Sequence, residues 1–380
     1  MTDRPLVSIL TPVYNGAAFL AHCIDSVLAQ TYEHWEYVLV DNASTDGTAA
    51  ILRDYATRDR RIRVHTNAVH VPVIPNHNMA ARLASPGAAW CKFVCADDAL
   101  FPECLERMVN IGLTHPSVGL ISAYQLRGTD VGLGGLPYPS PVTDGRTIGR
   151  LSLLGDLSVF GGPSAHMIRA DFLRRRDPFY DESNLHADTA ACYEVLESAD
   201  FGFVHQVLTF ARAHRGSLTH AVARRLNTFL LGHVKILLDH GPRFLTESEY
   251  AAALAQRMDA YYKFLARAVL APGRAEMWRY HRDGLAALGL PVNRLRLARV
   301  LCQQLGQVAT SPGHELPKLS RLLRRAGSED ANWHYWWAPT GFEVVRTDAA
   351  PSAAANGSSA RPASAPPPAP PPTPAPAPRG

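Results

Sequence analysis

Polar side chains follow two short apolar runs near the start of the chain, and a helix-like segment separates the two runs. These side chains are Thr11, Pro12, Tyr14 and Asn15 after the first run, and Asp41, Asn42 and Ser44 after the second. Ligands of open α/β sheets bind beyond the carboxyl ends of the strands. Hydroxyl, amide and carboxylate groups suit a nucleotide base and ribose there. No glycine-rich phosphate loop lies between the two runs.

Two adjacent carboxylates, Asp97 and Asp98, follow another apolar run. Neighbouring carboxylates repel each other unless a cation or hydroxyl donors lie between them. Mg²⁺ is usually held by one or two carboxylates together with substrate phosphates, and Mn²⁺ also prefers oxygen ligands. The pair therefore indicates a divalent-cation site that neutralises a diphosphate. The alternative is a solvated turn that caps a helix opening at Pro102.

These side chains need a sheet whose strands end at one edge, and alternating strand and helix patterns predict an α/β fold with a mostly parallel sheet. Strands are expected at 6–11, 35–41, 62–65, 90–96, 119–123, 167–168, 201–204 and 208–212. Helices are expected at 17–30, 48–58, 75–84, 102–114 and 188–198. The Gly- and Pro-rich segment 125–149 predicts a long surface loop. Beyond residue 220 the pattern is helical only, at 222–239, 247–270, 275–288, 293–307 and 316–326.

Composition narrows the class of protein. The 380 residues are 47% hydrophobic, which is ample for a packed core, and the formal charge of +4 gives no reason to expect a nucleic acid partner. Six cysteines without a metal-binding spacing indicate structural thiols in a reducing compartment. The start of the chain predicts no secretory signal, and no apolar run approaches the roughly 20 residues that span a bilayer. A cytoplasmic location, or one on the cytosolic face of a membrane, is expected.

The two runs resemble glycosyltransferase family 2. Val7–Gly16 reads VSILTPVYNG and Asp41–Thr48 reads DNASTDGT, in the order and at the spacing of that family, and the resemblance continues to about Thr219. It implies a GT-A fold and inverting transfer of a sugar from a nucleotide donor, with Mg²⁺ or Mn²⁺. It also implies that Asp98 binds the metal, that Asp97 reaches the ribose or the metal, and that Asp41 accepts N3–H of uracil or thymine. An Asx turn at Asp41 is compatible with that role.

The general base is expected later in the chain. The family carries a Glu-Asp pair at a helix start, and its second acid is the base. Here the matching segment places Ala187 before Asp188, so the first acid is absent and Asp188 is the best candidate. Its ordinary pKa of ~3.9 would keep it ionised at neutral pH without a large shift. Glu182 is the second candidate and His186 the third.

Two further segments resemble the family. Arg212–Thr219 resembles the segment that closes the catalytic domain, so that His214 completes the metal shell or, with Arg215 and Ser217, contacts the diphosphate; a basic surface turn is the alternative. Asn78 belongs to an Asn-x-Asn variant and helps to order the nucleotide loop, or is simply an early helix residue. His77 stands where many members carry an arginine.

The helical C-terminal region is rich in basic side chains. They are Arg267, Arg274, Arg279, Arg282, Arg294, Arg296, Arg299, Lys318, Arg321, Arg324 and Arg325. Solvated helix faces explain most of them. A second interpretation is peripheral contact with an anionic membrane that presents a lipid-linked acceptor. The aromatic cluster Trp333, Tyr335, Trp336 and Trp337 suits sugar stacking, an interface anchor or internal packing.

The predicted domains are a catalytic domain at 1–220, a helical region at 221–347 and a disordered tail at 348–380. The tail is rich in Pro, Ala and Ser and nearly free of large apolar side chains, so it cannot bury enough surface to offset its ordering entropy. Removing it is expected to leave the melting temperature and donor binding unchanged. A drop of several degrees in the melting temperature would contradict this.

Two functions fit the sequence. The first is an inverting, metal-dependent glycosyltransferase that builds a surface polysaccharide or another glycan. The second is a nucleotide-sugar-binding homologue that has lost transfer and acts in a biosynthetic complex, which the missing acid before Asp188 favours. The intact pair Asp97 and Asp98 favours the enzyme, because a pure binder need not retain a metal site. A nicotinamide dehydrogenase is disfavoured, since no G-x-G-x-x-G follows the first strand.

Overall fold

The computed structural model describes residues 4–214, 222–223, 225–270 and 275–310. All the described residues belong to one compact unit. The helix predicted at 316–326, the aromatic cluster and the predicted tail lie outside the described residues.

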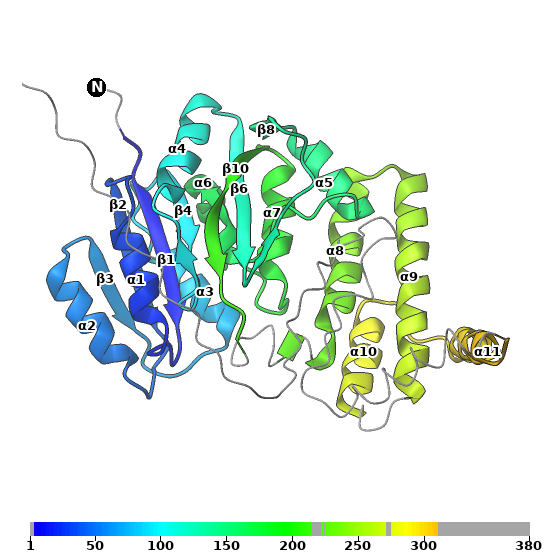
Figure 1. Ribbon diagram of the computed structural model, residues 1–380. Helices are drawn as coiled ribbons and strands as arrows, with labels where there is room; N and C mark the ends of the chain where they lie inside the picture. Colours follow the sequence, from blue (N-terminus) through cyan, green and yellow to red (C-terminus); the bar gives the residue numbers. More distant parts are fainter. Residues whose placement is uncertain (1–3, 215–221, 224, 271–274, 311–380) are drawn as a thin grey trace, which may run out of the picture. The chain divides into compact units, whose positions relative to one another are not determined.

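One sheet runs through the first two hundred residues (Figure 1). Its strands are β1 (Val7–Val13), β2 (Trp35–Asp41), β3 (Ile62–Thr66), β4 (Trp90–Phe93), β5 (Ala99–Leu100), β6 (Val118–Arg127), β7 (Asp130–Gly132), β8 (Val142–Thr143), β9 (His166–Arg169) and β10 (Asp200–Ala211). The main order is β3-β2-β1-β4-β9-β6-β10-β5. Strands β1, β2, β3, β4, β6 and β10 share one direction, because β9 pairs antiparallel with both β4 and β6. The predicted mostly parallel sheet is confirmed.

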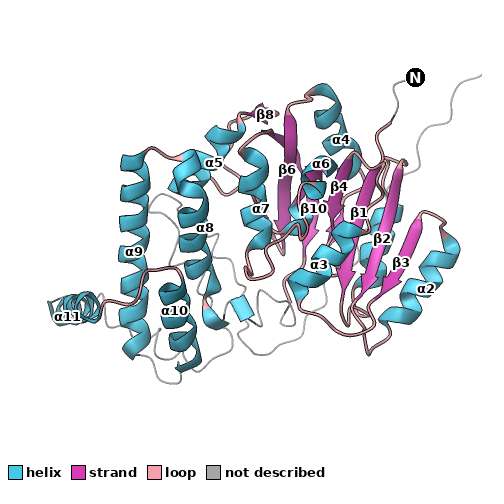
Figure 2. Cartoon of the chain, turned by 180° about the vertical axis from the view of Figure 1, so that it is seen from behind, coloured by secondary structure: helices cyan, strands magenta, loops and turns pink. Residues whose placement is uncertain are grey.

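Helices cover both faces of this sheet (Figure 2). They are α1 (Leu20–Leu28), α2 (Thr48–Arg58), α3 (Val73–Arg82), α4 (Cys104–Thr114), α5 (Gly145–Leu154), α6 (Ala170–Arg174) and α7 (Ala187–Leu196), with the short 3₁₀ helix η1 (Pro163–Ala165). Buried residues of α1, α2 and α4 form one core with the sheet, and those of α3, α5, α6 and α7 form a second. Both faces of β1 and β2 are therefore buried, which explains their nearly continuous apolar sequences.

The C-terminal helices are α8 (Thr228–Phe244), α9 (Glu247–Leu270), α10 (Ala275–Ala287) and α11 (Arg294–Thr310). They have a core of their own, around Tyr261 and Leu265 of α9. Buried residues of α8 and α9, including Leu237, also join the core that contains α5 and α7. The predicted boundary between 220 and 221 therefore has a shared core across it, and its exact place stays a prediction.

The structure differs from the predicted loop at 125–149. Strand β6 continues to Arg127, two short strands follow, and α5 begins at Gly145 with Thr147 N donating to the Asp144 carboxylate over 2.8 Å. The glycines of α5 weaken the helical pattern of its sequence, because glycine is a poor helix former. They serve packing instead: a Cβ at Gly149 would lie 2.3 Å from a ring carbon of Phe244.

The two strands predicted at 201–204 and 208–212 are one strand, β10. Its pairing with β6 shifts between Val204 and Val207, as a β-bulge requires. The bulge interrupts the alternating pattern that marks a strand, and this is why the sequence indicates two.

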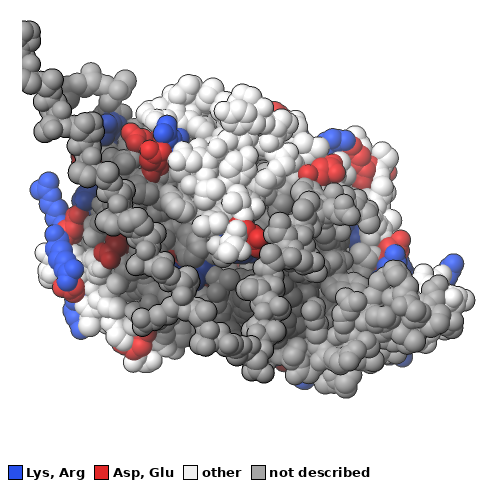
Figure 3. Space-filling view, in the orientation of Figure 1, with Lys and Arg blue, Asp and Glu red and all other residues white. Residues whose placement is uncertain are grey.

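Charged side chains on the described part of the face in Figure 3 lie interspersed, blue beside red. Among the described residues, charged side chains form ion pairs on the surface, for example Arg58 with Asp54 and Arg107 with Glu103. This part of the face therefore offers no broad field of one sign to a polyanion. No helix among the described residues combines the length and the hydropathy needed to cross a bilayer.

Candidate active site

The loops after β1 and β2 are joined to each other by hydrogen bonds. Val13 pairs with Asp41 in the sheet, so both loops start at the same level. Asn15 N donates to Ser44 Oγ over 2.9 Å, and Thr45 N donates to Asn15 Oδ1 over 2.8 Å. The sheet edge thus brings together the predicted residues of both runs.

The predicted residues of these loops differ in exposure. Thr11 is fully buried, and its hydroxyl donates to Val94 O over 2.7 Å, so it joins β1 to the end of β4. Tyr14 is 48% exposed, and its ring lies 4.3 Å from that of His70. Pro12 is buried within β1. Tyr14 is therefore the member of this group that offers a ring to a ligand.

Asp41 and Asn42 are both buried at the end of β2. Asp41 Oδ1 accepts from Ser44 N over 3.1 Å, which is the Asx turn, and Oδ2 makes no hydrogen bond to any described residue. Asn42 donates to Val71 O and accepts from Val71 N and Asn67 Nδ2, so its amide fixes the loop at 67–71. Asn42 is thus occupied inside the protein, whereas Asp41 keeps one carboxylate oxygen available.

The acidic pair lies beyond β4, at the same edge. Asp98 is buried: Oδ2 accepts from Ser164 Oγ over 2.6 Å and Oδ1 accepts from Arg212 N over 3.0 Å. Burial, and next the charge of Asp97, raise the pKa of Asp98 to about 6, although both hydrogen bonds act in the opposite direction. A bound cation would stabilise the buried negative charge of Asp98, which these two hydrogen bonds offset only in part.

His214 lies at the acidic pair. Its Nε2 is 2.8 Å from Asp97 Oδ2, and its ring packs 4.8 Å from that of Phe19. Arg212 Nε donates to Asp97 O over 3.0 Å, which holds the end of β10 against the acidic loop. Arg215 and Ser217 lie outside the described residues.

The chemistry of the donor set fits a hard divalent cation. Ligand atoms of Cys95, Asp97 and Asp98 lie within 4.8 Å of one another. Burial, and next the charges of the two aspartates, hold the pKa of the Cys95 thiol well above its usual value, so it stays neutral. Two carboxylate groups and the adjacent His214 imidazole remain, and oxygen ligands are those that Mg²⁺ and Mn²⁺ prefer.

Asp188 lies in the first turn of α7. Burial raises its pKa to about 6, against hydrogen bonds from its own N–H and that of Thr189. The expected unshifted pKa is therefore wrong. Burial, and next the charge of Asp188, raise the pKa of the Tyr180 phenol well above its usual value. Its buried hydroxyl has no hydrogen-bond partner in the described structure.

The alternative bases are held differently. Asn78 donates to Tyr180 O over 2.9 Å and to Glu182 Oε1 over 3.1 Å, and its Oδ1 accepts from Tyr180 N. Asn78 therefore orders segment 180–182, which bears Glu182. His186 precedes α7 at the N-cap position, and its Nε2 lies 3.1 Å from Thr228 Oγ1 at the start of α8. Burial lowers the pKa of His186.

Residues 8–179 match the family model described as Glycosyl transferase family 2. This part of the chain is therefore similar to glycosyltransferase family 2. The matched residues, called the family 2 domain below, contain both joined loops, the acidic pair and Ser164. Asp188 and His214 lie beyond the matched residues.

Named relatives align with about a third of the chain. The O-antigen biosynthesis protein RfbC of Myxococcus xanthus is 38% identical over 128 residues, which are 32% of this chain and 10% of that protein. The putative teichuronic acid biosynthesis glycosyltransferase TuaG of Bacillus subtilis is 32% identical over 127 residues, which are 33% of this chain and 50% of that protein. The chain thus spans between a tenth and a half of the lengths of these relatives.

A solved structure confirms the fold over most of the chain. The structure of S. aureus TarS 1-349 in complex with UDP-GlcNAc superposes with a TM-score of 0.55 at 16% identity, covering 84% of this chain and 91% of that chain. At this identity the likeness concerns the fold alone. The GT-A fold expected for the family 2 domain, followed by a helical region, is confirmed.

Sequence reasoning missed the residues that support the acidic pair. Ser164 and the main chain of Arg212 bind Asp98, and Lys92 lies beneath them. Ser164 is 66 residues from Asp98, so no local pattern connects the two. The turn that begins at Gly161 was a possible signal, because glycine at a positive φ, here +67°, marks a required backbone shape.

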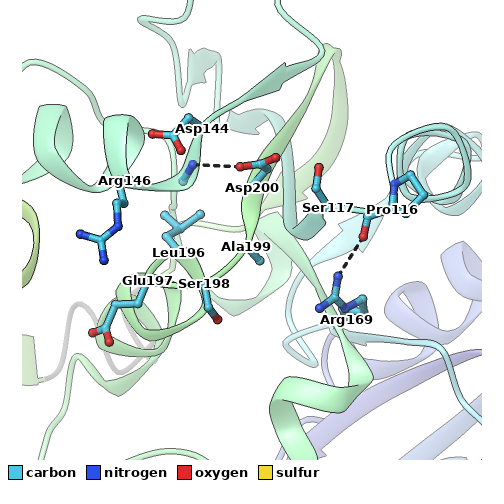
Figure 4. A pocket seen from close by; sticks show the side chains of 11 residues that line it. Pro116, Ser117, Asp144, Arg146, Arg169, Leu196, Glu197, Ser198, Ala199 and Asp200 are labelled. Carbon is cyan, nitrogen blue, oxygen red and sulfur yellow. Dashed lines mark hydrogen bonds between the residues drawn. The ribbon is translucent and has the colours of Figure 1, made fainter.

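A cavity of about 440 Å³ lies at the other edge of the sheet, where β6 and β10 begin (Figure 4). Most of its polar groups bind other parts of the protein: Arg169 donates to Pro116 O and Val118 O, Gly145 N donates to Asp200, and Arg243 donates to Glu197. Its polar lining is therefore mostly accounted for by the fold, and none of the predicted site residues lines it.

Proposed function

We propose that the chain is an inverting, metal-dependent glycosyltransferase. It would move a sugar from a nucleoside-diphosphate donor, UDP- or dTDP-type, to a hydroxyl of a glycan or lipid-linked acceptor in cell-surface polysaccharide biosynthesis. The observation that carries the proposal is the acidic pair, which shares one sheet edge with Asp41 inside a family 2 domain. The names of RfbC and TuaG support the polysaccharide role.

Each of the proposed residues has a separate role in donor binding or transfer. Asp41 Oδ2 accepts N3–H of the base, and Tyr14 lies beside the nucleoside. Asp98, with Asp97 and His214, holds Mg²⁺ or Mn²⁺, which when bound neutralises the diphosphate. The acceptor oxygen attacks the anomeric carbon and its proton passes to Asp188. The bond to the diphosphate oxygen breaks, and the diphosphate leaves with the electron pair.

A donor screen tests the proposal. The full chain, with Mg²⁺ or Mn²⁺, is mixed with a panel of nucleotide sugars, and both ligand-induced thermal shift and release of nucleoside diphosphate are measured. A uracil or thymine donor that raises the melting temperature and releases its diphosphate supports the enzyme. Binding without release, with or without added glycan acceptors, supports the inactive homologue that Ala187 favours. No response to any donor would contradict both functions.

The rate of transfer should fall at acid pH. A base with a pKa of about 6 is ionised at pH 7 and is lost as the pH falls through 6, because the protonated carboxyl cannot accept the acceptor proton. We therefore expect kcat, measured at saturating donor and metal between pH 5 and 8, to drop with a midpoint near 6. A rate that stays constant between pH 8 and pH 5 would contradict Asp188 as the base.

Helix α11 supports the proposed membrane contact. Its partly buried side, including Leu297 and Val300, packs with the core of α9, while Leu295 is 84% and Leu305 45% exposed on another side. Arg294 and Arg299 flank these leucines at 100° per residue, and α11 contains no acidic residue. A leucine stripe edged by arginines suits an anionic lipid surface.

Co-sedimentation with vesicles tests this contact. The full chain should bind vesicles that contain an anionic lipid and should bind neutral vesicles less. Replacing both Leu295 and Leu305 by Gln should reduce that binding and leave donor binding unchanged. Equal binding of the variant and the unmodified chain would contradict the contact through α11.

A further inference from the structure

Among the described residues, Lys92 of β4 is a buried cation without an acidic partner in direct contact. Its side chain is 0% exposed, and its Nζ donates to Ser164 O over 2.6 Å and to His166 O over 3.3 Å. Burial lowers the pKa of Lys92, whereas the charge of Asp98 favours its ammonium form. A buried ammonium is costly compared with an apolar side chain of the same size. Packing alone therefore does not explain a lysine here.

Lys92 binds Ser164, and Ser164 in turn binds Asp98, the candidate metal ligand. Ser164 Oγ donates to Asp98 Oδ2 over 2.6 Å and accepts from Cys95 N over 2.9 Å. The N–H of Arg212 binds the other oxygen of Asp98 over 3.0 Å. The carboxylate of Asp98 is thus held from two sides, and one of these sides is linked directly to Lys92.

The turn that carries Ser164 has few other supports. It consists of Gly161, Gly162 and η1, which is only three residues long, and its internal main-chain bond runs from Ala165 N to Gly162 O. Ser122 Oγ donates to Ala165 O over a longer distance, 3.4 Å. The two short hydrogen bonds of this region, from Lys92 and to Asp98, lie on opposite sides of Ser164.

We propose that Lys92 and Ser164 are positioning residues that orient the Asp98 carboxylate for the metal-bound diphosphate. The inference rests on the proposed metal-dependent donor binding. Lys92 acts through the carbonyl of Ser164, and Ser164 acts through its hydroxyl on Asp98. Neither residue contacts the substrate.

Binding of UDP with and without Mn²⁺, measured by calorimetry on the full chain, tests the proposal. Ser164→Ala should weaken the Mn²⁺-dependent binding about 10-fold, the usual effect of losing a hydrogen bond to a charged group, and should leave metal-free UDP binding unchanged. Ser122→Ala is the matched control, because it removes a buried hydroxyl from the same region without touching Asp98. It should change the affinity less than about 2-fold.

A double-mutant cycle separates positioning from general damage. Lys92→Met should weaken Mn²⁺-dependent binding without a large loss of melting temperature, since apolar replacement of a buried charge is often tolerated. The double variant with Ser164→Ala should lose no more affinity than the worse single variant, because both act on Asp98 by one route. Additive losses would overturn the role of Lys92, and wild-type affinity of Ser164→Ala would overturn that of Ser164.

Crystal structures without metal test the positioning role separately from the proposed function. If the unmodified chain binds no nucleoside diphosphate with Mn²⁺, the proposed function fails. The positioning role is then judged in the ligand-free crystals alone. The Asp98 side chain should rotate in Ser164→Ala and stay in place in Ser122→Ala. An unmoved Asp98 in both variants would overturn the positioning role.

Discussion

Replacing Asp188 by Asn is expected to leave nucleotide affinity unchanged and to reduce the rate of transfer roughly 10²–10⁴-fold, the usual contribution of a positioned general base. The substitution keeps the size of the side chain and removes its ability to accept a proton. Because burial raises the pKa of Asp188, the neutral amide should also be tolerated at this position. The measurement is kcat at saturating donor, with calorimetry of UDP binding beside it.

Glu182→Gln is the matched control for this prediction. Glu182 is exposed and keeps a hydrogen bond from Asn78 through an oxygen that the glutamine also has. We expect its rate to stay within a few-fold of that of the unmodified chain. A dead Glu182→Gln beside a fully active Asp188→Asn would make Glu182 the base. If both variants are active, the base lies outside this segment.

Helices and strands with a regular apolar pattern could be predicted from the sequence alone. Strand β2, helix α2 and helix α9 have the predicted bounds, because each has an apolar pattern along its whole length. Helix α5 was missed, since its glycines are required by distant segments: Gly149 lies against the ring of Phe244 and Gly145 against the main chain of Ala199. The loop residues around Asn15 and Ser44 could be grouped because parallel strands end at one edge.

The environment of the site could not be predicted in the same way. Asp98 and Asp188 were found by their neighbours in the sequence, but their raised pKa values come from burial by distant segments. Lys92 looked like an ordinary residue of a strand, because its partners are main-chain carbonyls 72 and 74 residues away. A single sequence contains no signal for such a contact.

Replacing Asp98 by Ala is expected to abolish the Mn²⁺-dependent part of nucleoside diphosphate binding. Asp98 is the more buried acid of the pair, and both of its oxygens are held in place, so its orientation is fixed before any ligand arrives. A preformed ligand contributes more to metal affinity than a mobile one, because less conformational freedom is lost on binding. The measurement is the thermal shift caused by UDP with and without Mn²⁺.

The fold should survive this substitution, because the loss of two hydrogen bonds is offset in part by relief of the repulsion from Asp97. Asp98→Asn keeps the acceptor oxygen and the shape, and should show the same loss of metal dependence with a smaller change in melting temperature. Asp177→Ala, which removes an exposed partner of Arg82, is the control and should bind UDP and Mn²⁺ normally. Metal-dependent binding that persists in Asp98→Ala would place the cation on other residues, with Asp97 and His214 the next to test.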